Sequence, residues 1–280
     1  MALDVLLAVL LGALLHAAWN TMIRGAENRT LDTVLVVAGA GAIMLALLPF
    51  APLPAAASWP YAIASGAIHV AYFLLVAGAY RHGELSFVYP LMRGTAPALS
   101  ALAAALLLAE IPALMGWTGI ALICGGVLLL AGDAWHKANF HSHAALFAFG
   151  TAGIVVIYTL VDGVGVRLSG NAAVYTGWVF LLTALPLLMI FLLRDRPATL
   201  AYARRHWRRG LFGGACTLAS YALALWAMTQ APIALVAALR ETSVVFGTLL
   251  AATLLQERIS ALRWMAVLVV VAGAVAIKLA

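Results

Sequence analysis

Apolar residues fall in blocks of roughly 20 along the whole chain, separated by short polar or turn-forming stretches. At about 1.5 Å per residue, a helix of that length crosses a hydrocarbon core of about 30 Å. The pattern predicts an all-α polytopic membrane protein with ten transmembrane helices. The first block lacks a basic flank and a small-residue cleavage site, so we expect a retained helix rather than a signal peptide. The predicted spans are residues 2–23, 31–49, 60–80, 86–108, 114–131, 144–166, 173–193, 210–229, 232–255 and 261–279.

An internal repeat organises these spans into two halves. Shifting the chain by 147 residues places Arg93 on Arg240 and Glu110 on Glu257, so that "LLLAEIPALMGW" overlays "LLLQERISALRW". The polar stretch at 132–143 then separates two five-helix repeats, residues 1–131 and 144–280. Because each half has an odd number of spans, the second half enters the membrane from the opposite side. Inverted repeats of this kind are typical of secondary transporters.

The charged residues predict the orientation. Only 9% of the 280 residues are charged, against about 25% in a soluble domain, and 65% are hydrophobic. Twelve of the 16 Lys and Arg residues lie in or beside the odd-numbered connections, which share one side; Arg167 and Lys278 lie on the other side. The positive-inside rule then places both termini outside the cytoplasm. We expect a multi-pass protein of the cytoplasmic (inner) membrane, with the lipid bilayer and not nucleic acid as its macromolecular partner.

A family resemblance covers essentially the whole chain. The segments "HGELSFVYPLMRGTAPALSALAAALLLAE" and "APIALVAALRETSVVFGTLLAATLLQER", each followed by a Gly-rich helix, resemble the EamA-type drug/metabolite transporter family. Within it, "LLHAAWN" and "YPLMRG" look like the branch of phosphonate-utilisation-associated membrane proteins. The resemblance implies a helical bundle with a central cavity and carriage of small metabolites, often outward.

Two arginines within spans are the main candidates for substrate recognition. Arg93 lies eight residues into its span, about 12 Å deep, and Arg240 repeats the situation from the opposite side. Intramembrane charges face a partner or a wet cavity, and a guanidinium offers a bidentate fork to a carboxylate, phosphate or phosphonate. The alternative is a structural ion pair with Asp162 or Glu241. Pro90 and Pro97 remove backbone donors near Arg93, which predicts a kink there.

Asp162 and Glu241 are the two carboxylates that we place near mid-membrane. Glu241 directly follows Arg240, so the two point to different faces of one helix. Either carboxylate can pair with Arg93, bind a substrate amine or take up a coupling proton, and the sequence leaves these roles open.

Polar and aromatic side chains inside other spans are candidates for the cavity wall. His16 and Asn20 are four residues apart and share a helix face, although a lone histidine in an apolar helix often only packs. Buried tyrosine hydroxyls need partners, which favours a cavity position over packing. The remaining substrate-binding candidates are His69, Tyr72, Tyr89, Tyr158, Tyr221 and Trp226.

These features predict a transporter rather than an enzyme. The chain has no Walker motif, no HExxH and no G-x-S-x-G elbow, so we expect no cofactor and no metal. We predict a secondary active transporter, an exporter or exchanger of a small anionic or zwitterionic metabolite such as an amino acid, working by alternating access as a monomer or homodimer with possible proton coupling. The alternatives are an uptake carrier for phosphonate-like anions and a membrane scaffold or sensor.

Overall fold

The computed structural model describes the backbone of residues 1–81, 85–135, 142–254, 256 and 259–280. Side chains are described within residues 1–75, 93–130, 150–253, 256 and 259–280. Within these ranges every regular element is a helix. The α-helices are α1 Leu3–Arg24, α2 Arg29–Leu47, α3 Trp59–Arg81, α4 Leu85–Leu108, α5 Leu114–Trp135, α6 Ser142–Ser169, α7 Ala172–Gln230, α8 Ile233–Arg240, α9 Ser243–Leu254 and α10 Ala261–Leu279.

Local sequence signals set several helix ends. The side chains of Asn28, Asn171 and Ser260 each accept a hydrogen bond from the backbone N–H three residues on, so they cap α2, α7 and α10. Seven helical stretches of the described residues are long and apolar enough to cross a membrane, and Arg93–Leu108 and Leu114–Leu130 are shorter apolar stretches. The chain is therefore a helical multi-pass membrane protein, and the count of ten spans stays a prediction.

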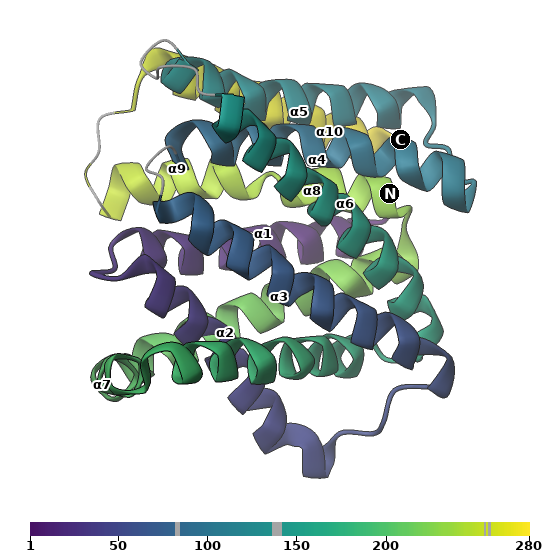
Figure 1. Ribbon diagram of the computed structural model, residues 1–280. Coiled ribbons are helices and arrows are strands. Elements are labelled where there is room, and N and C mark those ends of the chain that lie inside the picture. Colours follow the sequence, from purple (N-terminus) through teal and green to yellow (C-terminus); the bar gives the residue numbers. More distant parts are fainter. Residues whose placement is uncertain (82–84, 136–141, 255, 257–258) are drawn as a thin grey trace.

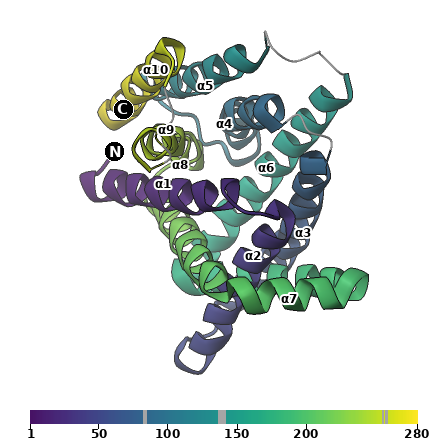
Figure 2. The ribbon, with the colours of Figure 1, turned by 90° about the vertical axis from the view of Figure 1, so that its left-hand side faces the viewer.

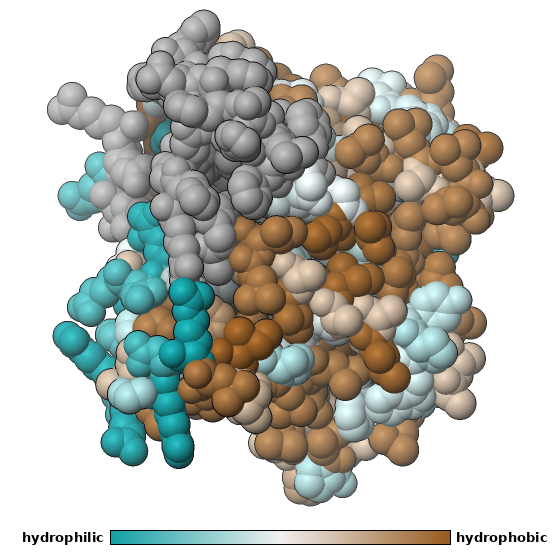
Figure 3. Space-filling model, viewed as in Figure 1, coloured by the Kyte–Doolittle hydropathy of each residue, from teal (hydrophilic) through white to brown (hydrophobic). Residues whose placement is uncertain are grey.

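The helices form a bundle of layered pairs. In Figure 1, α5 and α10 lie along one edge, α2 and the first part of α7 lie along the other, α1, α4, α8 and α9 run between them, and α3 and α6 cross the view obliquely. Figure 2 gives the same order from the end of the bundle. α2 packs against α7, α1 against α9, and α4 against α6. Most of the surface in Figure 3 is apolar, as a lipid-facing surface requires, and hydrophilic side chains gather at one end.

α7 departs from the predicted pattern. Residues 194–209 were expected to be a polar connection, yet they are helical, and non-helical backbone at Asp195 and His206 bends the helix twice. The two bends separate an apolar helix up to Arg194 from a second apolar helix that ends at Gln230. Both chain ends lie at the opposite end of the bundle from this bent stretch (Figure 1). There Lys278 Nζ donates to the carbonyl of Met1 at 2.7 Å.

α5 and α10 cross at unusually close range. A Cβ added to Gly273 would lie 2.7 Å from Ile123 Cγ1 and 2.8 Å from the Gly119 carbonyl oxygen. A Cβ added to Gly126 would lie 2.7 Å from Val270 Cγ2 and 3.0 Å from the Ala266 carbonyl oxygen. The 147-residue offset relates Gly126 to Gly273, Ile123 to Val270 and Gly119 to Ala266. The two helices therefore approach each other through equivalent contacts.

This crossing predicts a stability difference between two glycines. We expect Gly273→Ala to destabilise the protein by about 1–3 kcal/mol, because a methyl group there overlaps backbone as well as a side chain. Gly125→Ala is the matched control on α5, since an added Cβ meets nothing within 4 Å, and it should hold or slightly raise stability. Thermal melting of the purified variants measures both. Equal melting temperatures would contradict the close crossing.

Candidate substrate-binding site

A break between two helices lies at the centre of the candidate site. α8 ends at Arg240 and α9 begins at Ser243, with Glu241 and Thr242 in a turn between them. The Thr242 hydroxyl donates to the Leu239 carbonyl at 2.7 Å, which satisfies one of the carbonyls freed by the break. A cation at a helix C-terminus and an anion before a helix N-terminus both match the helix dipoles. The turn therefore stabilises the charges of Arg240 and Glu241 where the sequence places them.

Arg93 pairs with Glu241. Arg93 Nε lies 2.9 Å from Glu241 Oε2, and each residue is only 5% exposed. Arg93 Nη2 is also 3.4 Å from His16 Nε2 and 3.4 Å from the Ser243 hydroxyl, to which it donates. Asp162 and Glu241 were the two carboxylates predicted as alternative ion-pair partners of Arg93. Glu241 forms the pair and Asp162 does not. The pair joins α4 to the break between α8 and α9.

Arg240 is placed differently from Arg93. Its guanidinium carbon lies 5.0 Å from the centre of the Tyr221 ring, a cation–π contact. Within the described part of the chain it forms no hydrogen bond or ion pair, and its side chain is half-buried. The N–H groups of the Arg240 guanidinium are thus available to bind a ligand at the centre of the bundle.

Asp162 is held by two tyrosines. It is fully buried, Oδ1 accepts a hydrogen bond from the Tyr175 hydroxyl at 2.9 Å, and Oδ2 accepts a short one from the Tyr221 hydroxyl. Tyr175 was not among the predicted residues, because its place at the start of α7 gave no sign that it reaches α6. Since Tyr221 contacts Arg240 with its ring and Asp162 with its hydroxyl, this one side chain links the two charges.

An aromatic cluster surrounds this link. The ring of His69 lies 4.5 Å from that of Tyr158 and 5.6 Å from that of Tyr221, between ring centres. Tyr72 lies 5.9 Å from Tyr158 in the same way. His69 Nδ1 is 3.1 Å from the Ser65 hydroxyl and 2.9 Å from the Ser65 carbonyl oxygen, which fixes the orientation of the imidazole. The structure therefore brings four predicted aromatic residues together beside Arg240.

The other predicted residues lie differently. The Asn20 amide donates to the His16 carbonyl of its own helix at 2.8 Å. Trp226 packs against the hydrophobic core. The side chain of Tyr89 lies outside the described part of the structure.

A second polar cluster lies at the bundle end that holds the chain termini (Figure 1). Glu110 accepts a close ion-paired hydrogen bond from Arg167, and its other oxygen accepts from the Ile233 backbone N–H at 2.9 Å. Arg167 also donates to the carbonyls of Met228 at 2.8 Å and Ala231 at 3.2 Å. These contacts, here called the terminal latch, tie the end of α4 to the end of α6 and to both sides of the turn between α7 and α8.

Long apolar helices around buried charges at a broken helix define a multi-pass membrane protein of the transporter class. A model of the EamA-like transporter family matches residues 4–132 and again residues 142–279, so the chain belongs to the EamA-like transporter family. Its members are transporters rather than enzymes, which agrees with the family resemblance of the sequence. The phosphonate-utilisation branch stays a prediction.

Comparison with solved structures bears on the fold alone. One of 26 matching chains, described only as "Crystal structure of protein", superposes with a TM-score of 0.78 at 20% sequence identity. The match covers 100% of this chain and 98% of the other. No curated protein matches the chain.

Proposed function

We propose that the chain is a secondary transporter that exports or exchanges a small metabolite with a carboxylate, phosphate or phosphonate group, by alternating access around Arg240. The observation behind this proposal is the half-buried Arg240 guanidinium, which has no ion-pair partner among the described residues. A buried arginine costs several kcal/mol unless a partner or water compensates it. An anionic substrate group supplies that compensation and matches the bidentate fork.

The two arginines have different roles in this proposal. The charge of Arg93 is offset by Glu241 at 2.9 Å, so the pair serves as a helix clamp next to the site. Arg240 receives the anion, and the rings of Tyr158, Tyr221 and His69 form the wall beside it. An amino acid fits this arrangement through its carboxylate, as does any small organic anion.

The repeat supports alternating access. Under the 147-residue offset, α4 corresponds to α8 and α9, and α5 corresponds to α10. The equivalent glycine contacts between α5 and α10 are what a two-fold relation between inverted halves would produce. We propose that residues 1–131 and 144–280 are these halves, with both termini outside the cytoplasm.

Counterflow in proteoliposomes tests the proposal. Vesicles containing the purified chain are loaded with unlabelled amino acids, organic acids or phosphonates in turn, and uptake of the labelled compound is measured. We expect counterflow for at least one compound with an anionic group and none for neutral analogues of it. Counterflow of neutral analogues alone would overturn the proposal, and the absence of counterflow for every compound would favour a scaffold or sensor.

Proton coupling is proposed to act through Asp162. Protonating Glu241 would remove the ion-pair partner of the buried Arg93, whereas Asp162 has no ion-pair partner among the described residues and is held by two neutral hydroxyls. A change in the charge of Asp162 also acts on Arg240 across the Tyr221 ring. The two binding events are therefore coupled, each changing the affinity for the other.

We expect collapse of the proton gradient to reduce net flux of the wild type several-fold while leaving counterflow intact. Asp162→Asn should make net flux independent of the gradient. Tyr221→Phe, which keeps the ring against Arg240 and removes the hydroxyl from Asp162, should weaken the gradient dependence and keep counterflow. Flux assays with and without an ionophore measure both. If gradient collapse and Asp162→Asn both leave net flux unchanged, Asp162 does not couple a proton.

A further inference from the structure

The middle stretch of α7 is a short helix that lies at a membrane surface. It joins two apolar stretches, Ala172–Arg194 and the part of α7 that ends at Gln230, through non-helical backbone at Asp195 and His206. Because the flanking stretches are both long enough to cross the bilayer, the segment between the bends must lie at the level of the headgroups. Asp195 Oδ1 accepts from the Ala198 N–H at 3.1 Å and so caps the start of this helix.

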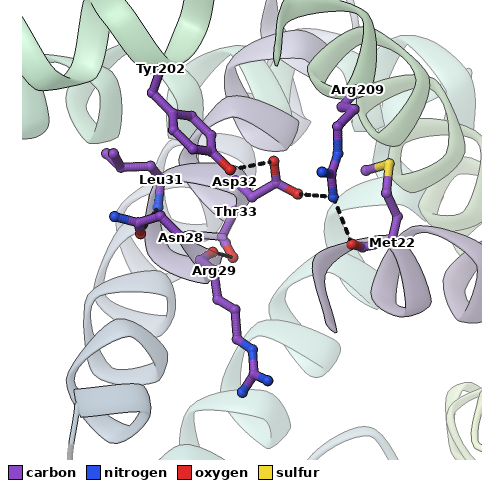
Figure 4. A network of polar contacts seen from close by, with 8 residues as sticks. All are labelled: Met22, Asn28, Arg29, Leu31, Asp32, Thr33, Tyr202 and Arg209. Carbon is purple, nitrogen blue, oxygen red and sulfur yellow. Dashed lines mark hydrogen bonds and ion pairs between the residues drawn. The ribbon is translucent and has the colours of Figure 1, made fainter. Parts of the chain in front are cut away.

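One side of this helix, and of the first turn after its second bend at His206, is fixed to the protein. The Tyr202 hydroxyl donates to Asp32 Oδ1 at 3.1 Å, and Arg209 Nη2 donates to Asp32 Oδ2 at 3.3 Å and to the Met22 carbonyl at 2.9 Å. Figure 4 shows Tyr202 and Arg209 converging on the Asp32 carboxylate, which is fully buried. Burial and the neighbouring Asp32 carboxylate raise the pKa of the Tyr202 hydroxyl to about 12, so it stays protonated and donates. The anchored face determines which residues point outward.

The outward face is cationic and partly apolar. Arg196, Arg204, Arg205 and Arg208 are all exposed, and Arg208 lies over the Trp207 ring at 5.3 Å from its centre. The only acidic contact described for these four arginines is a loose one, Arg205 to Glu27 at 3.7 Å between exposed side chains. This is the bundle end where hydrophilic side chains gather beside the apolar surface (Figure 3). The four arginines and Trp207 are here called the basic face.

We propose that the basic face binds the headgroups of anionic phospholipids in the adjacent leaflet. Charge complementarity identifies the partner, because four guanidinium groups at headgroup level face the phosphates of that leaflet. Guanidinium groups bind phosphate bidentately, and a tryptophan at the interface places its ring among the upper acyl carbons. Because Asp32 and Met22 bind Tyr202 and Arg209, lipid binding at the basic face would act on the ends of α1 and α2 as well as on α7. The inference does not depend on the substrate proposed above.

Titration of the purified full chain with lipid tests the proposal. Native mass spectrometry counts bound phosphatidylglycerol and, separately, phosphatidylcholine with the same acyl chains. Each surface arginine near an anionic membrane contributes roughly a fivefold change in the binding constant. We expect phosphatidylglycerol to bind more tightly to the wild type, and the variant R204Q/R205Q/R208Q to bind it at least tenfold more weakly. The variant R204K/R205K/R208K keeps the charge and should lose far less.

Two further arms separate lipid binding from simple phosphate binding and from a loss of folded protein. Glycerol 3-phosphate at equal concentration should not displace phosphatidylglycerol, because it lacks the acyl chains that Trp207 contacts. The melting temperature of the glutamine variant without added lipid should match the wild type, since Tyr202, Arg209 and Asp32 are untouched. Unchanged phosphatidylglycerol binding by the glutamine variant, equal binding of phosphatidylcholine by the wild type, or displacement by glycerol 3-phosphate would each overturn the proposal.

Discussion

Arg240→Ala is expected to lower substrate affinity on the order of a hundredfold or more while the protein still folds. A hydrogen bond to a charged group contributes about 1.5–3 kcal/mol, and a bidentate contact loses two of them. The protein should still fold, because Arg240 has no ion-pair partner among the described residues. Its removal therefore leaves no buried charge without a partner. Arg240→Lys keeps the charge and loses the fork, so we expect an intermediate affinity.

Counterflow measured over a range of substrate concentrations checks this result. Both variants are reconstituted at matched amounts after their folded fraction is verified by size-exclusion chromatography. Wild-type affinity in the alanine variant would show that the anion binds elsewhere.

Glu241→Ala should have the largest effect on stability, a loss of about 3–5 kcal/mol, because it leaves the Arg93 guanidinium buried without its carboxylate. The double variant R93M/E241L replaces the pair by apolar side chains and should recover most of the loss. Glu27→Ala is the matched control: its pair with Arg205 is exposed at 3.7 Å, so its removal should change little. Thermal melting and the yield of folded protein measure all three variants.

The double variant also separates two roles for Arg93. If the pair is only a clamp, R93M/E241L should recover counterflow together with folding, because Arg240 remains. A double variant that folds like the wild type but shows no counterflow would place Arg93 in contact with the substrate.

The sequence predicted the helical class from its apolar blocks, and it identified charged side chains inside them as candidates for a site. Apolar blocks of about 20 residues have few other stable forms, and Arg93, Arg240 and Asp162 were recognisable as charges inside them. His69, Tyr72, Tyr158 and Tyr221 were proposed because their polar atoms need partners in a dry bundle, and the structure places their rings in one cluster; their part in binding stays a prediction.

The inequivalence of the two arginines was not predicted, although the sequence contains its cause. Under the 147-residue offset Glu241 corresponds to Gly94, so a carboxylate follows the arginine in only one half. A Cβ added to Gly94 would lie 2.7 Å from Leu128 Cγ, so that position is closely packed. Of the two carboxylates predicted near mid-membrane, Asp162 is held by tyrosine hydroxyls and Glu241 pairs with Arg93, which leaves Arg240 without an ion-pair partner among the described residues.

The position of the helix break was also missed, for a different reason. Pro90, Pro97 and Gly94 predicted a kink around Arg93, and α4 runs as one helix from Leu85 to Leu108, so the kink stays a prediction. The interruption lies at Glu241 and Thr242, in a stretch without proline or glycine. There the hydrogen bond of Thr242 and the ion pair with Arg93 stabilise the turn, and local sequence does not report such tertiary contacts. By contrast, the helix after Asp195 begins with a capping aspartate and has a proline two residues on, Pro197, in its first turn, a start signal that the sequence contained.

The terminal latch has a consequence for the resting population of conformations. In a carrier that alternates between two states, the contacts of Glu110 with Arg167 and with the Ile233 N–H exist only while the end of the bundle near the chain termini is closed. They therefore shift the unliganded protein toward that state. A substrate arriving from that end finds the competent state only fractionally populated, and its apparent affinity falls by that fraction. Under the proposed mechanism, affinity measured from the two sides of the membrane would then differ although the proposed contact with Arg240 is the same from both.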